Sequence, residues 1–148
     1  RGNSRDGYQL GVALLNEGKT REAVERLDAF VRTYSLPYRL VPGWLEPPRS
    51  DVVAARVLMA RISASERQWS QAAEQAELAL NMMPSHAEAR RILVAALINV
   101  GVARAMVGDF DQAVEFFRRA LKVDPANASA RDLLALALED QQIAAARR

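Results

Sequence analysis

Apolar residues recur every three or four positions along most of the chain, with polar residues between them. The first apolar stripe begins at Tyr8 and is interrupted at Gly18. The second runs from Thr20 to about Tyr34, and its apolar face consists of Ala23, Val24, Leu27, Phe30 and Val31. This spacing is that of a helix with one buried face, so it predicts two amphipathic α-helices joined by a short turn.

The rest of the chain predicts five more helices. The expected N-terminal caps are Asp51, Ser85 (in a capping box with Glu88), Asp109 and Asn127. The expected ranges are about 52–66, Trp69 to Met82, the Ser85 cap to about Val107, Phe110 to Val123, and the Asn127 cap to about Ala146. No segment alternates apolar and polar residues as a β-strand does, so the predicted fold class is all-α.

Residues 35–50 interrupt this pattern with four of the six prolines. Proline fixes φ and removes an N–H donor, so the segment is not a continuous helix. It is nevertheless apolar, with Tyr38, Leu40, Val41, Trp44 and Leu45. Because disordered linkers are poor in such residues, we expect an ordered loop lying on the helices, with Trp44 near the junction of the first two helix pairs.

Two segments of the chain resemble each other at a fixed separation. Trp69, Ala72, Ala79 and Pro84 correspond to Phe110, Ala113, Ala120 and Pro125 (110−69, 113−72, 120−79 and 125−84 all equal 41). Upstream, Ala60 corresponds to Gly101 at the same separation (101−60 = 41). Self-similarity at such a period is typical of stacked helical hairpins, none of which buries its apolar face alone.

These residues resemble the tetratricopeptide repeat, a helix–turn–helix unit of about 34 residues. In the third unit Gly101 fits the small residue of the first helix, Phe110 the aromatic that opens the second helix, and Pro125 the closing proline. The second unit has Ala76 where the family has an aromatic. The resemblance implies one domain, 1–148, built as a right-handed superhelical array of antiparallel helix hairpins.

The expected divisions are repeat one (about 4–34), a proline-rich insertion (35–50), repeat two (about 51–84), repeat three (about 85–125) and a capping helix (about 127–146). The separation of 49 between repeats one and two (72−23) places extra residues in the insertion. The separation of 41 between repeats two and three exceeds the family period of about 34 by about two helical turns, which we expect to lengthen the neighbouring helices.

Charge and cysteine content narrow the classes of function. The formal net charge is +2, and the 20 basic and 18 acidic residues are nearly balanced. Arginine pairs such as Arg90-Arg91, Arg118-Arg119 and Arg147-Arg148 are interleaved with acidic residues and lack an aromatic platform, so no nucleic-acid partner is expected. The absence of cysteine excludes disulfides and thiolate sites.

No feature of the sequence indicates the compartment. The longest apolar run, Ile92 to Ile98, is too short to span a bilayer, so direct membrane insertion is not expected. No signal peptide is visible, and the chain opens with Arg1, which indicates a fragment of a longer protein. Both the cytoplasm and the periplasm remain open, and the preference for arginine over lysine, together with abundant alanine, indicates a GC-rich bacterium.

Candidate catalytic chemistry is sparse. His86 is the sole histidine, and because Ser85 adjoins it in sequence the two cannot adopt triad geometry, so we expect an exposed residue in the first turn of a helix. Asp109 is better explained as a cap, and the Glu139-Asp140 pair as polar surface. No glycine-rich phosphate loop or metal-ligand spacing occurs. We therefore expect no enzymatic activity, no cofactor and no metal.

The resemblance implies a concave face lined by the first helix of each repeat, where peptides bind. The positions that fall on it are Arg5, Tyr8, Val12, Leu15 and Asn16 in repeat one, Val57, Arg61 and Ser65 in repeat two, Ile98, Val102 and Met106 in repeat three, and Leu136 in the capping helix, with Trp44 as a possible rim residue. Family members that hold terminal carboxylates have a set of Lys, Asn and Arg in this groove. Asn99 is the one suitable polar residue at the matching positions here, so that clamp is absent.

An apolar groove of this kind suits an amphipathic helix or an extended hydrophobic peptide. We therefore predict a non-catalytic protein–protein interaction module or scaffold with a protein or peptide partner. Two alternatives remain open at this stage. One is a self-association domain, hence a homo-oligomer, whose groove is filled internally or by a second copy. The other is an accessory domain of a larger enzyme.

Overall fold

The computed structural model describes residues 4–34 and 49–148, and Trp44 and the other predictions for residues 35–48 lie outside this part. The described residues form seven helices and no strand, which confirms the all-α prediction. They are α1 (Ser4–Asn16), α2 (Thr20–Tyr34), α3 (Arg49–Ser65), α4 (Trp69–Met82), α5 (Ala87–Met106), α6 (Phe110–Val123) and α7 (Ala128–Ala146).

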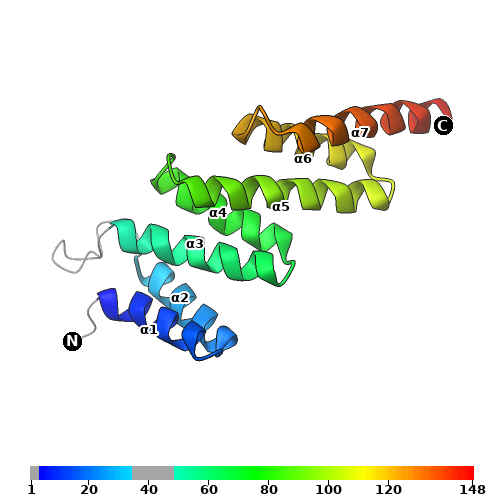
Figure 1. Ribbon diagram of the computed structural model, residues 1–148. Coiled ribbons are helices and arrows are strands. Elements are labelled where there is room, and N and C mark those ends of the chain that lie inside the picture. Colours follow the sequence, from blue (N-terminus) through cyan, green and yellow to red (C-terminus); the bar gives the residue numbers. More distant parts are fainter. Residues whose placement is uncertain (1–3, 35–48) are drawn as a thin grey trace.

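The helices stack as successive antiparallel hairpins, with the N-terminus at one end of the array and the C-terminus at the other (Figure 1). The hairpins are α1–α2, α3–α4 and α5–α6, and α7 closes the array against α6. The odd-numbered helices also contact one another in sequence, α1 with α3, α3 with α5, and α5 with α7. They therefore form one layer, and α2, α4 and α6 form the other.

Several predicted helix ends are confirmed by their hydrogen bonds. The Asp109 carboxylate accepts from the Gln112 N–H at 3.2 Å at the start of α6. The Asn127 side chain accepts from the Ala130 N–H at 2.9 Å at the start of α7. Each cap satisfies one N–H that has no partner within its helix.

Two predicted caps are wrong. Asp51 lies inside the first turn of α3, because this helix begins at Arg49. Ser85 does not cap α5. Instead His86 has the extended backbone of a cap, and its Nδ1 accepts from the Ala89 N–H at 3.2 Å. His86 is therefore partly buried at the helix end, where we expected an exposed first-turn residue.

Close helix packing depends on small residues at matching positions of each hairpin. A Cβ at Gly101 would lie 2.6 Å from Phe117 Cε1, and a Cβ at Gly11 would lie 2.6 Å from Leu27 Cδ2. In both hairpins the small residue precedes the large one by 16 positions (117−101 and 27−11). The side chains of Phe117 and Leu27 thus occupy the volume that the missing Cβ atoms leave open.

Candidate functional site

The most exposed apolar side chains of α5 and α7 flank a shared hollow. Met106 is 82% exposed and Leu136 is 57% exposed. The hollow between the two helices has a volume of about 240 Å³, and its apolar lining includes Val102, Ala105, Met106, Leu133, Leu136 and Ala137. Three of the sequence-predicted groove residues, Val102, Met106 and Leu136, therefore lie around one depression.

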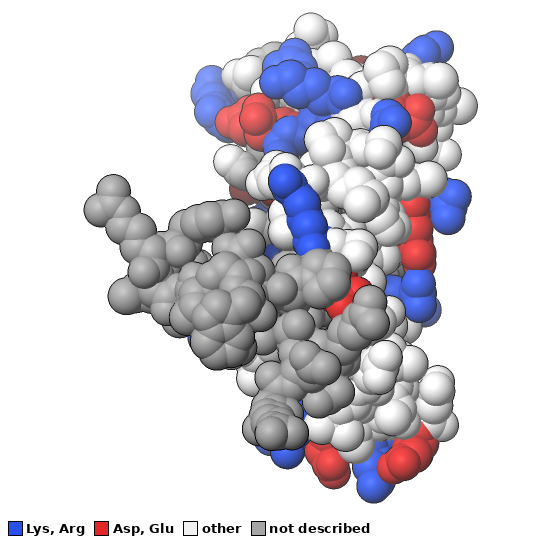
Figure 2. Space-filling view, turned by 90° about the vertical axis from the view of Figure 1, so that its left-hand side faces the viewer, with Lys and Arg blue, Asp and Glu red and all other residues white. Residues whose placement is uncertain are grey.

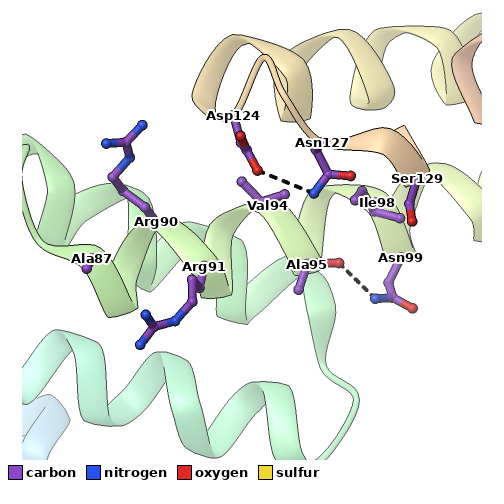
Figure 3. A pocket seen from close by; sticks show the side chains of 10 residues that line it. All are labelled: Ala87, Arg90, Arg91, Val94, Ala95, Ile98, Asn99, Asp124, Asn127 and Ser129. Carbon is purple, nitrogen blue, oxygen red and sulfur yellow. Dashed lines mark hydrogen bonds between the residues drawn. The ribbon is translucent and has the colours of Figure 1, made fainter. Parts of the chain in front are cut away.

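A second hollow of about 590 Å³ lies beside the N-terminal half of α5 and the α6–α7 turn (Figure 3). Its floor includes the apolar residues Val94, Ala95 and Ile98 of α5. Its rim is polar and includes Arg90, Arg91, Asn99, Asp124, Asn127 and Ser129. The predicted groove residue Ile98 thus lines this second hollow, and α5 contributes to both.

The polar groups of this rim are mostly engaged within the protein. Figure 3 shows Arg90 and Arg91 pointing to opposite sides of α5. The Arg90 guanidinium donates to the Val123 carbonyl at 2.8 Å, at the C-terminal end of α6. The Asn99 amide donates to the Ala95 carbonyl of its own helix at 2.8 Å. The rim therefore offers few free polar groups, whereas the floor exposes apolar side chains.

Residues predicted from repeats one and two lie differently. Tyr8, Val12 and Leu15 are partly buried and pack against the core between α1, α2 and α3. Val57 is only 3% exposed and is clustered with Val53, Ala79 and Ala89. Its placement on an open groove is therefore wrong, because α4 and α5 cover that face of α3.

The polar residues predicted in the groove have local partners or lie at its ends. The Arg61 guanidinium forms an ion pair with Glu88 at 2.6 Å and so joins α3 to α5. The Ser65 hydroxyl donates to the Ile62 carbonyl at 2.7 Å. Asn16 is exposed at the C-terminal end of α1, and the side chain of Arg5 lies outside the described residues. Arg61, which we expected on the groove, is thus tied to a neighbouring helix through its ion pair with Glu88.

Figure 2 shows the side of the molecule where α1, α3, α5 and α7 have their N-terminal ends. Both basic and acidic side chains lie on this face. Basic and acidic residues lie near one another there, and uncharged residues cover most of the described surface between them. Several basic side chains gather at the upper end of this face, with acidic side chains among them, so the charge there is mixed (Figure 2).

Over residues 4–34 and 49–148, no three His, Cys, Asp or Glu side chains lie close enough together to hold a metal ion. Within the same ranges, no helix is both long enough and apolar enough to cross a bilayer.

Comparison with known proteins agrees with the geometry of the array. Residues 94–127 match the family model of the tetratricopeptide repeat. No curated protein matches the chain. A similar solved structure is the C-terminal TPR-containing domain of a Plasmodium falciparum protein described as FK506-binding, with 17% sequence identity and a TM-score of 0.53. The match covers 96% of this chain and 90% of that chain, and at this identity it shows a shared fold alone.

Proposed function

From the tetratricopeptide repeat that this chain carries within an array of the same fold, we propose that it holds an amphipathic helix or hydrophobic peptide of a partner protein against α5 and α7. Repeats of this family generally mediate protein–protein interaction. The choice of the α5–α7 face and of an apolar peptide as the ligand is based on the exposed apolar residues of this chain.

The observation that carries the proposal is the exposure of Met106 and Leu136 on either side of one hollow. Burying a side chain of this size contributes about 1.5–3 kcal/mol relative to leaving it in water. Methionine is also flexible enough to adapt to partners of different shape. Two such anchors on neighbouring helices favour association with a third apolar helix.

The spacing along α5 supports a helical or extended ligand. Ile98, Val102 and Met106 follow one another at intervals of four and form a row along the helix. Ile98 lines the larger hollow, and Val102 and Met106 line the smaller one. A ligand lying along this row would meet both hollows, which is how helices bind in apolar grooves.

The test begins by selecting amphipathic peptides that bind the chain from a display library and measuring their dissociation constants by isothermal titration calorimetry. Met106→Glu and Leu136→Glu should each weaken binding about tenfold or more, because a charge replaces a buried apolar contact. The matched control is Ile143→Glu, since Ile143 is also an exposed apolar residue of α7 but lines neither hollow. Equal losses in all three variants would argue against the α5–α7 groove.

Self-association is the competing explanation of the same apolar surface. Sedimentation velocity over a range of concentrations distinguishes the two, because a groove filled by a second copy gives a concentration-dependent mass. If Met106→Glu converts a dimer to a monomer, the groove serves self-association. A monomer at all concentrations supports the peptide-binding proposal. The absence of enzymatic activity stays a prediction.

A further inference from the structure

The C-terminal end of α5 extends well past the turn between α3 and α4 (Figure 1). This overhang follows from the separation of 41 between repeats two and three, about two turns beyond the family period of about 34. On one side the end of α5 packs against α6 and α7. On the other side it faces the α3–α4 turn across a third hollow of about 530 Å³, which we term the notch.

The notch combines two cations with an apolar surface. Arg67 lines it from the α3–α4 turn and Trp69 from the start of α4. Ala103 and Arg104 line it from α5, and Val107 from the position just after that helix. Trp69 is partly buried, and its side chain is part of the lining of the notch. Val107 is 76% exposed, which leaves an apolar side chain in water at this edge.

Among the described residues, neither guanidinium in the notch has a carboxylate partner. The side chains of Arg67 and Arg104 make no hydrogen bond or ion pair with other described residues, whereas Arg61 and Arg119 pair with carboxylates of neighbouring helices. No carboxylate is among the described residues that line the notch, and the adjoining acidic residue along the chain is Glu66. The notch therefore carries a local positive charge on a chain that is nearly neutral.

The backbone at Arg67 is a further sign that its side chain has a use. Arg67 has φ of 59°, in the left-handed region that glycine adopts most easily. The matching turns of the other two hairpins have Gly18 and Gly108, with φ of 78° and 81° (67−18 = 49 and 108−67 = 41, the repeat separations). An arginine thus stands where the turn itself favours glycine, and its side chain faces the notch.

We propose that the notch binds an acidic segment of a partner protein, with carboxylates on Arg67 and Arg104 and an apolar side chain against Trp69 and Val107. Guanidinium groups form strong paired hydrogen bonds with carboxylates. A nucleic acid fits less well, because two cations neutralise few phosphates and the surface between them is apolar. The notch lies on the side of α5 away from the α7 groove, so this proposal does not depend on the groove.

The probes are two fluorescein-labelled helical peptides of equal length, with leucine at the apolar positions and either glutamate or glutamine at the polar ones. In a Trp44→Phe background, Trp69 emission reports occupancy of the notch. The glutamate peptide should bind about tenfold more tightly than the glutamine peptide, and this preference should weaken as salt is added. Equal affinity for the two peptides would overturn the proposal.

Substitutions in the whole chain test whether the preference for the glutamate peptide depends on the notch. Arg67→Gln combined with Arg104→Gln should abolish the preference for the glutamate peptide. Arg118→Gln is the matched control, since it removes one exposed arginine of α6 that has no described partner. If the preference survives loss of both notch arginines, or if a single-stranded oligonucleotide displaces the glutamate peptide at lower concentration than unlabelled peptide does, the proposal is wrong.

Arg67→Gly separates binding from folding. Glycine suits the positive φ, so the melting temperature should be unchanged or higher, while affinity for the glutamate peptide should fall several-fold. A variant that melts earlier and binds normally would show that Arg67 is there for structure, and would contradict the proposal.

Discussion

Repeats two and three have the same architecture but fill the space between their helices differently. In repeat three, Gly101 of α5 leaves room for the ring of Phe117 in α6, which is only 1% exposed. In repeat two the matching residues are Ala60 and Ala76, both fully buried and part of one apolar cluster. The separation is 16 residues in each pair (117−101 and 76−60).

The two repeats therefore fill the space between their helices with different residue types. A glycine facing a phenylalanine and an alanine facing an alanine are two ways to bring two helices together without a void. The large ring makes repeat three depend on one side chain, whereas repeat two spreads its contacts over small ones. Substitutions at matching positions should therefore have unequal effects in the two repeats.

The largest effect is expected for Phe117→Ala. Removing the ring leaves a cavity beside Gly101, and changes of this kind cost about 3–5 kcal/mol of unfolding free energy. The matched change in repeat two, Ala76→Gly, should cost about 1 kcal/mol, mainly through lower helix propensity. Urea denaturation followed by far-UV circular dichroism measures both, and similar costs would show that the two repeats are packed alike.

Gly101→Leu should be the next most disruptive. Its Cβ alone would lie 2.6 Å from Phe117 Cε1, so the helices must separate or the ring must move. Overpacking of this kind costs about 1–3 kcal/mol and occasionally more. Thermal melts check the result, and a variant as stable as the parent would mean that α5 and α6 are not in the register described.

The contact between residue 101 and Phe117 predicts that the effect of Gly101→Ala on stability changes sign when Phe117 is removed. Gly101→Ala should destabilise the parent chain, because the new Cβ meets Phe117. In the Phe117→Ala background it should stabilise by up to about 1 kcal/mol, because alanine favours a helix more than glycine does. The double variant then has the Ala–Ala pair of repeat two. Equal effects in both backgrounds would mean that the two residues are independent.

The turns of the two repeats should also differ. Gly108 has φ of 81°, and a Cβ added there would meet no described atom within 4 Å. Gly108→Ala therefore tests backbone strain alone, at about 1–2 kcal/mol. Arg67 already has a side chain at the matching position, so Arg67→Ala should change unfolding free energy little. Chemical denaturation of the two variants measures the contrast, and equal costs would contradict it.

The smallest expected effects concern the caps of α5 and α7, at His86 and Asn127, which are also 41 residues apart (127−86). Asn127→Ala should cost about 1 kcal/mol, because it removes a favoured capping side chain. His86→Ala should cost the same or less, and His86→Asn should match the parent. A large loss for His86→Ala alone, measured by thermal melts, would show a role for the imidazole beyond its hydrogen bond to Ala89.

The sequence by itself determined the helices and their order. The bounds of α2, α4 and α6 agree with those predicted, because the apolar period and the turn residues act within a few positions of one another. The small residue at Gly101 and its repeat partners were also visible, since the 41-residue separation aligns them. Part of the candidate groove, Ile98, Val102 and Met106, could be placed because one helix face repeats every three or four residues.

Only the tertiary structure decided which of those faces stay open. Val57 lies on the predicted groove face of α3, yet α4 and α5 bury it, and Arg61 is paired with Glu88, 27 residues away (88−61). The notch could not be predicted either, because Arg67 and Arg104 resemble solvated surface residues until the overhang of α5 brings them to one hollow. Local patterns determine where a helix begins and which face is apolar, but exposure depends on neighbours that are distant in sequence.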